Sequence, residues 1–177
     1  MDVPGNLTMR DSTGPTVGNI VKAGAPFIHN FGFNNTFIGS GAGNFTMTHP
    51  FGSNTATGFQ ALHSNINGFN NTASGRTALL SNTIGFNNTA SGDDALSSNT
   101  TGNYNTAFGS NADVSAGNLT NATAIGFGAI VNASNKIRLG NEAVTVIEGL
   151  VGLTARLWSV GSARTAEPGY KRFLHGG

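Results

Sequence analysis

Short runs of alternating small apolar and hydroxyl-bearing residues recur along most of the chain, and the run Thr72-Ala73-Ser74-Gly75 is typical. In an extended segment successive side chains point to opposite faces, so Ala73 and Gly75 share one face while Thr72 and Ser74 share the other. Residues 30–142 are not expected to form helices, because glycine and the many Asn, Ser and Thr residues there disfavour helical hydrogen bonding. The pattern therefore predicts an all-β fold of short strands.

The run returns with a fixed period of 17 residues, which is marked by Gly58, Gly75, Gly92, Gly109 and Gly126. A threonine and an alanine stand three and two residues before each glycine, and another alanine follows three residues after it. A leucine comes next in three of the units, as Leu62, Leu79 and Leu96. A unit this short cannot enclose a core by itself, so each unit must bury its apolar positions against its neighbours. The period predicts a parallel β-solenoid with 17-residue coils.

Within each coil we expect a second strand around the leucine, for example at residues 78–80, to supply the large buried side chain. The glycines between units are expected to mark turns with positive φ; they are Gly68, Gly85 and Gly102.

Equivalent residues of stacked coils lie about 4.7–4.9 Å apart and form ladders along the stack. Two asparagine ladders are predicted, one of Asn54, Asn71, Asn88 and Asn105 and one of Asn65, Asn82 and Asn99. Their amides can hydrogen-bond to one another and to turn backbone, which satisfies polar groups inside a narrow solenoid. The same spacing places Asp93 one coil above Arg76, so these two side chains are expected to pair.

Four segments are expected along the chain. Residues 1–29 form an N-terminal lead-in or cap, residues 30–142 the repeat array, residues 143–152 a capping strand, and residues 153–177 a basic appendage. The coil that carries His49 and Pro50 is two residues longer than the others and is expected to bulge.

The composition of the chain argues against several classes of function. The net charge is +1 and about a tenth of the residues are charged, without the clustered Lys and Arg that nucleic-acid binding requires. The chain has no cysteine and no run of apolar residues long enough to span a membrane. Its first residues have neither the positive nor the apolar segment of an export signal, so we expect the sequence to be a fragment if the protein is exported. We expect no cofactor, no nucleic-acid partner and no membrane span.

A single coil buries about one leucine, which stabilises it by roughly 1.5–3 kcal/mol. The stability of one thin solenoid by itself is therefore expected to be marginal. Side-by-side packing of several chains supplies the missing burial, and a symmetric homotrimer is the expected assembly.

Three segments then carry a resemblance: 105–109 (Asn-Thr-Ala-Phe-Gly), 122–129 and the closing 135–141 (Asn-Lys-Ile-Arg-Leu-Gly-Asn). They resemble the head repeats of trimeric autotransporter adhesins, and similar arrays occur in tail-fibre-like surface proteins. The resemblance implies a left-handed parallel β-roll, a homotrimer, and a structural or adhesive module of a bacterial surface or phage fibre. It also implies an extracellular or cell-surface location, with host or matrix surfaces as ligands.

The alternative is a hydrolase or metal-dependent enzyme with its site at the trimer interface. A single histidine near a three-fold axis can build a multi-ligand site, and His29, His49 and His63 are the candidates. Asp93 and Asp94 could form a carboxylate pair for acid–base chemistry. Loop histidines, and strand carboxylates that point to opposite faces, are the more ordinary interpretation, so no catalytic site is expected.

Two further columns have ordinary interpretations. A threonine column, Thr55, Thr72, Thr89 and Thr106, would suit ice binding but is more typical of interior or interface packing. Phe69 and Phe86, one coil apart, are more typical of turn or inter-subunit packing than of a ligand platform.

Overall fold

A computed structural model describes residues 11–14, 18–48 and 51–144. The chain divides into one unit over residues 1–145 and a second over residues 146–177, and the second lies outside the described part. The expected basic appendage, residues 153–177, and the loop residues His49 and Pro50 therefore lie outside it as well.

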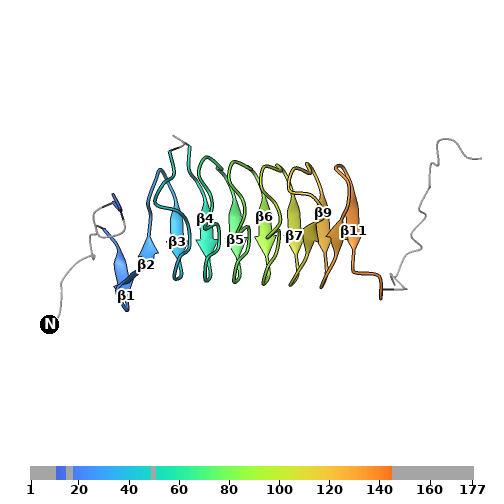
Figure 1. Ribbon diagram of the computed structural model, residues 1–177, viewed down its shortest axis with the longest axis horizontal. Helices are drawn as coiled ribbons and strands as arrows, with labels where there is room; N and C mark the ends of the chain where they lie inside the picture. Colours follow the sequence, from blue (N-terminus) through green and yellow to red (C-terminus); the bar gives the residue numbers. More distant parts are fainter. Residues whose placement is uncertain (1–10, 15–17, 49–50, 145–177) are drawn as a thin grey trace, which may run out of the picture. The chain divides into compact units, whose positions relative to one another are not determined.

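One nine-stranded sheet runs through the array in the order β1-β2-β3-β4-β5-β6-β7-β9-β11 (Figure 1). Its strands are β1 (Ile20–Lys22), β2 (Ala25–His29), β3 (Thr36–Ile38), β4 (Thr55–Thr57), β5 (Thr72–Ser74), β6 (Thr89–Ser91), β7 (Thr106–Phe108), β9 (Thr123–Ile125) and β11 (Ile137–Leu139). A second sheet pairs β8 (Asp113–Val114) with β10 (Ile130–Val131). The part of the chain that the structure describes contains no helix.

The strands from β3 to β11 pair in parallel, each with its equivalent in the next coil. Thr72 lies opposite Thr89 and Ala73 opposite Ala90, one 17-residue period apart. This confirms the predicted all-β, parallel β-solenoid with 17-residue coils. The solenoid has about six turns. The last coil is shorter, since β11 pairs with β9 at a spacing of 14 residues, with Ile137 opposite Thr123.

The predicted alternation within the strands is confirmed. Ala73 is buried and its neighbours Thr72 and Ser74 are exposed. The equivalent alanines of the other coils are buried as well, between neighbours that are exposed or half-buried. The core consists mainly of these alanines, the alanines after the repeat glycines and one leucine per coil in three of the coils. Because the inward side chains are so small, the coil is narrow and its backbone segments approach closely.

The expected second strand at residues 78–80 is wrong. Leu79 has a positive φ of 54°, and the segment forms successive turns in which the Leu80 amide donates to Thr77 O at 3.1 Å and the Asn82 amide to Leu79 O at 3.1 Å. These local bonds bend the backbone so that the leucine points into the coil, where it is fully buried. Leu62 and Leu96 have the same geometry.

The expected positive φ at Gly68, Gly85 and Gly102 is also wrong. In the repeat units, the glycines of the 17-residue grid have positive φ instead, as Gly75 does with φ 138°. Glycine is needed at position 85 because a Cβ there would collide with the side-chain oxygen of Asn82 and the carbonyl of Gly102 in the next coil. The requirement is close approach between coils, not an unusual dihedral angle.

Gly85→Ala is therefore expected to destabilise the protein by about 1–3 kcal/mol or more, because the coils must separate to admit the methyl group. Chemical denaturation followed by circular dichroism measures the change. Gly14→Ala is the matched control, since a Cβ at Gly14 meets nothing within 4 Å. Equal stability of the two variants would contradict this account of coil packing.

Both asparagine ladders lie inside the solenoid. In the first, the backbone N–H of Asn71 donates to Asn54 Oδ1 at 3.0 Å, while the side-chain Nδ2 of Asn71 donates to Gly85 O at 2.8 Å. In the second, Asn82 Nδ2 donates to Asn65 Oδ1 at 3.0 Å. These bonds confirm that the stacked amides satisfy one another and the turn backbone, as buried polar groups must.

An antiparallel hairpin precedes the array, because β1 pairs with β2 and β2 pairs in turn with β3. At the other end, a capping strand over residues 143–152 was expected. Ala143 lies in a turn and Val144 lies outside any strand, and the rest of that segment is beyond the described residues.

Candidate functional site

The outer face of the large sheet carries two regular columns of side chains. One column consists of exposed threonines, namely Thr36, Thr55, Thr72, Thr89 and Thr106. In a single chain these threonines lie on the surface, so interior packing does not explain them. The second column holds Thr57, Ser74 and Ser91 in the middle coils.

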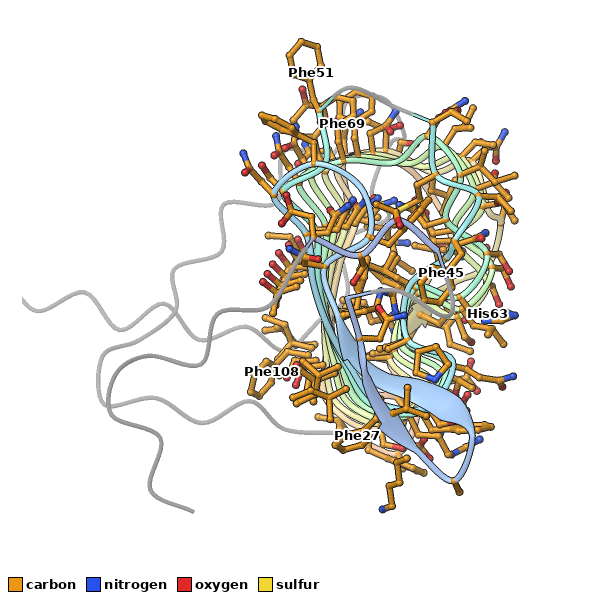
Figure 2. All side chains as sticks on the ribbon, turned by 90° about the vertical axis from the view of Figure 1, so that its left-hand side faces the viewer. Phe27, Phe45, Phe51, His63, Phe69 and Phe108 are labelled. Carbon is orange, nitrogen blue, oxygen red and sulfur yellow. The ribbon has the colours of Figure 1, made fainter. Side chains whose placement is uncertain are left out.

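Toward the last coils this second column becomes apolar. Phe108 lies opposite Ile125, and Ile125 opposite Leu139, in continuous parallel register. All three are exposed, Phe108 at 65%, and Ile137 extends the neighbouring column. Viewed along the stack, Phe108 points away from the coil (Figure 2). Adjacent exposed apolar side chains on a flat sheet are typical of an interaction surface.

Sequence reasoning did not single out this apolar column. Its signal was present, because a large apolar residue directly precedes the glycine in Phe108-Gly109, Ile125-Gly126 and Leu139-Gly140, where the middle coils have Thr or Ser. The alternation rule places that position outward. The structure adds that the three side chains lie in one continuous register and that no other described part of the chain covers them.

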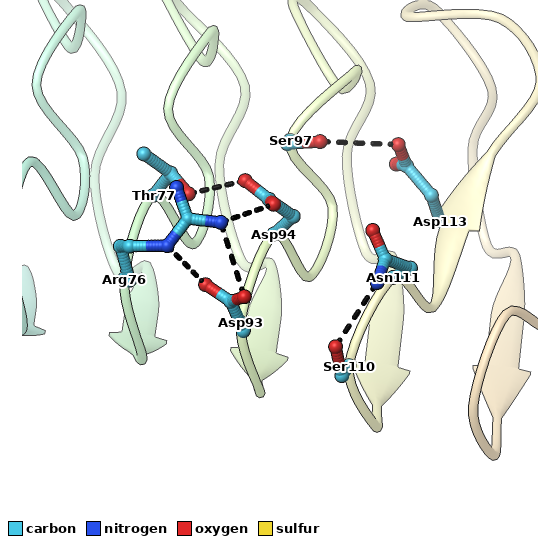
Figure 3. Close-up of polar contacts among 8 residues, drawn as sticks. All are labelled: Arg76, Thr77, Asp93, Asp94, Ser97, Ser110, Asn111 and Asp113. Atoms are coloured by element: carbon cyan, nitrogen blue, oxygen red, sulfur yellow. Dashed lines mark hydrogen bonds and ion pairs between the residues drawn. The ribbon is translucent and has the colours of Figure 1, made fainter.

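A polar cluster occupies the turns that follow β5 and β6 (Figure 3). Arg76 Nε lies 2.8 Å from Asp93 Oδ1, and Arg76 Nη2 lies 2.7 Å from Asp94 Oδ2. Thr77 donates its hydroxyl hydrogen to Asp94. Hydrogen bonds and charge from Asp93, with a smaller contribution from Asp94, raise the pKa of Arg76.

The expected Arg76–Asp93 contact is thus present, but the expectation that Asp93 and Asp94 point to opposite faces is wrong. They lie in a turn, where the period-two rule of strands does not hold, and both face the guanidinium. With both carboxylates held by a permanent cation, the pair is arranged as an exposed ion-pair network.

Asp113 is the third acidic side chain on this side of the solenoid (Figure 3). Its carboxylate accepts a hydrogen bond from the Val114 amide at 2.8 Å and from the Ser98 amide at 3.2 Å. Burial raises the pKa of Asp113, and these hydrogen bonds oppose the shift. The carboxylate therefore connects the turn that ends at Ser98 to β8.

Two of the candidate histidines line one open cavity of about 420 Å³ beside the N-terminal hairpin. His29 is buried, and its Nε2 lies 2.7 Å from Ala42 O. His63 is exposed, and its Nδ1 lies 3.0 Å from Gly41 O. Figure 2 places His63 on the side of the coil away from Phe108. The third candidate, His49, lies outside the described residues.

Within residues 11–14, 18–48 and 51–144, no three His, Cys, Asp or Glu side chains are grouped as a metal site would require. Asp93 and Asp94 belong to the Arg76 cluster, and the cavity's lining residues include neither of them. The same residues contain no helix that is long and apolar enough to cross a membrane.

Phe69 and Phe86 stack with ring centroids 4.8 Å apart and planes only 4° from parallel, and Tyr104 meets Phe86 edge-on at 5.4 Å. The stack lies at the edge of the coil where Phe51 and Phe69 are seen in Figure 2. The rings therefore pack along the turns of one chain, as expected. Phe69 and Phe86 turn one ring face each toward the other, so these two faces are closed to a ligand.

Comparison with protein-family models, with curated proteins and with solved structures returned no match to this chain. Its architecture is compatible with a structural repeat module, and the sheet face is the strongest candidate for a functional surface.

Proposed function

We propose that this chain is a structural and adhesive module that self-associates into a homotrimer through the outer face of its large sheet. The observation that carries the proposal is the exposed apolar column Phe108–Ile125–Leu139, which continues the hydroxyl-bearing columns on the same face. These side chains are already partly covered in the single chain, so full burial of each would contribute less than the roughly 1.5–3 kcal/mol of a fully exposed one.

Trimeric packing suits this face for three reasons. Its strands are in parallel register, its central side chains are small, and strands β3 to β7 carry no charged residue. Flat, uncharged and small-featured surfaces can approach closely around a symmetry axis. The left-handed winding and the likeness to adhesin heads or tail fibres belong to the same proposal, since they rest on the resemblance of the repeat residues.

The proposed setting is extracellular or at a cell surface, with host or matrix surfaces as ligands of the assembled module. In such a module the stacked coils act as a spacer and the outward turns present side chains to the ligand. Binding of the purified protein to matrix-coated surfaces, compared with uncoated ones, tests the adhesive part.

Phe108→Asp is expected to convert the trimer into a folded monomer, because it places three charges near one another in the interface without requiring any change inside the coil. Sedimentation should give about three times 18.1 kDa for the wild type and one chain mass for the variant. Circular dichroism should show the same strand content for both.

Phe127→Asp is the matched control, since Phe127 is 68% exposed but follows the repeat glycine and lies outside the strands. It should leave the trimer intact. A wild-type chain that sediments as a stable monomer at micromolar concentration would overturn the proposed assembly.

A further inference from the structure

The N-terminal hairpin covers the first strand of the parallel array. Ile28 pairs with Ile38 and His29 with Phe37, and the Gly39 amide donates to Phe27 O at 2.7 Å. Without the hairpin, this edge of β3 would present unpaired amide and carbonyl groups, the type of edge to which other chains add strands. Whatever holds the hairpin in place therefore controls access to the end of the solenoid.

Both ring nitrogens of His29, the last residue of β2, take part in hydrogen bonds. Nε2 lies 2.7 Å from Ala42 O, so it must carry a hydrogen and donate, while Nδ1 accepts from the Phe31 amide at 3.4 Å. Only the neutral imidazole with its hydrogen on Nε2 satisfies both partners. A second proton on Nδ1 would face the amide hydrogen of Phe31.

The surroundings of the ring are apolar. His29 is 4% exposed, stacks on Phe45 at a centroid distance of 4.3 Å, and contacts Phe37 at 4.9 Å. Burial lowers the pKa of His29, and the hydrogen bond to Ala42 opposes the shift. Attraction between an imidazolium and the Phe45 ring would offset only part of the cost of burying a charge.

Few charged or titratable groups of the described chain lie near this ring. Asp11 accepts a hydrogen bond from Asn30 Nδ2 at 3.0 Å, and Lys22 Nζ lies 5.4 Å from the centre of the Phe27 ring. His63 lines the same cavity but bonds to Gly41 O. Among the described residues, no carboxylate hydrogen-bonds to His29, so protonation gains no ion pair there.

We propose that His29 is a proton-sensitive latch, which holds the β1–β2 hairpin over the edge strand β3 at neutral pH and releases it in acid. Release uncovers the β3 edge and the fully buried ring of Phe37. The open end is then an attachment surface for a strand of a second copy of this chain.

The direction of the pH dependence follows from the protonation states. In the open hairpin His29 is solvated and titrates near the ordinary value of about 6.5, whereas in the closed hairpin its pKa lies lower. The latch is therefore fully effective above about pH 6.5 and weakens as the pH falls through the pKa of the closed form. Each unit of pKa difference allows about a tenfold increase in the open population.

Hydrogen exchange of the full-length protein, measured by mass spectrometry at pH 7.5 and pH 5 and corrected for intrinsic rates, tests the latch. Peptides over residues 25–45 should lose protection in acid, because the lowered pKa of closed His29 favours the open hairpin there, while peptides over residues 72–109 should keep theirs. Uniform loss over both regions, or no loss at residues 25–45, would overturn the proposal.

Two variants separate the latch from general acid sensitivity. Glutamine at position 29 can donate to Ala42 O and accept from the Phe31 amide but does not titrate, so His29→Gln should stay protected at both pH values. His63→Gln, in the same cavity, should respond like the wild type. A His29→Gln variant that opens in acid as the wild type does would refute the role of His29.

A measurement on the unmodified protein covers the case in which His29→Gln does not fold. Titration of the histidine rings by NMR should give His29 a pKa below 6.5. A pKa at or above that ordinary value would equally overturn the latch.

Discussion

Leu79→Asp is expected to unfold the array, with a loss of several kcal/mol in the free energy of unfolding. Leu79 is fully buried and is the one large apolar side chain inside its coil. The substitution removes that apolar volume and places a carboxylate where the surrounding core is alanine and leucine. Because neighbouring coils stack directly on this one, the damage should spread beyond a single unit. Thermal or urea denaturation followed by circular dichroism measures the loss.

Ile84→Asp provides the control within the same period of the chain. Ile84 is 50% exposed, so a carboxylate at that position remains in water and should change the stability little. If Leu79→Asp melted together with Ile84→Asp and the wild type, the inward direction of the leucine column would be wrong.

Asn88→Ala should have the next largest effect, a loss of about 2–4 kcal/mol. Asn88 is fully buried; its Oδ1 accepts from the Asn105 amide at 2.9 Å and its Nδ2 donates to Gly102 O at 2.8 Å. Alanine leaves the Asn105 amide without its acceptor and opens a cavity beside it, whereas Gly102 O keeps a bond from Asn99 at 3.1 Å. Chemical denaturation under the same conditions gives the difference.

Asn118→Ala is the control for the loss of an asparagine, because Asn118 is exposed. Its replacement should fall within about 0.5 kcal/mol of the wild type. If the two variants lost similar amounts of stability, the hydrogen bonds of the internal asparagine ladder would not stabilise the fold.

Much of the internal arrangement could be predicted from the sequence. A 17-residue period puts each residue against its equivalent one coil away, so Asn71 meets Asn88 and Ala73 meets Ala90 whatever the exact path of the coil. Alternation within a strand then decides which side chains point inward, as at Thr72-Ala73-Ser74. Both rules depend only on spacing along the chain, and both describe the strands and ladders correctly.

The turns could not be predicted in this way. The direction of Leu79 depends on a left-handed backbone conformation and on hydrogen bonds closed over three residues, which the period-two rule does not describe. For the same reason Asp93 and Asp94 both reach Arg76, and Gly85 is required by a carbonyl of the next coil instead of by its own φ.

The two features on which the proposals rest, the apolar column and the buried His29 ring, also depended on the tertiary structure. The repeat predicts that Phe108 and Ile125, one period apart, stack and point outward. The folded chain adds Leu139, which follows at only 14 residues, and leaves all three side chains exposed. His29 lies outside the repeat, so no period predicts its partners. Its burial follows from the antiparallel docking of the hairpin, which brings residues 13 and 16 positions later in the chain, Ala42 and Phe45, against the ring. The spacing of the repeat determined which residues stack on one another. The contacts of the turns and of the N-terminal hairpin do not follow that spacing, so only the tertiary structure decided them.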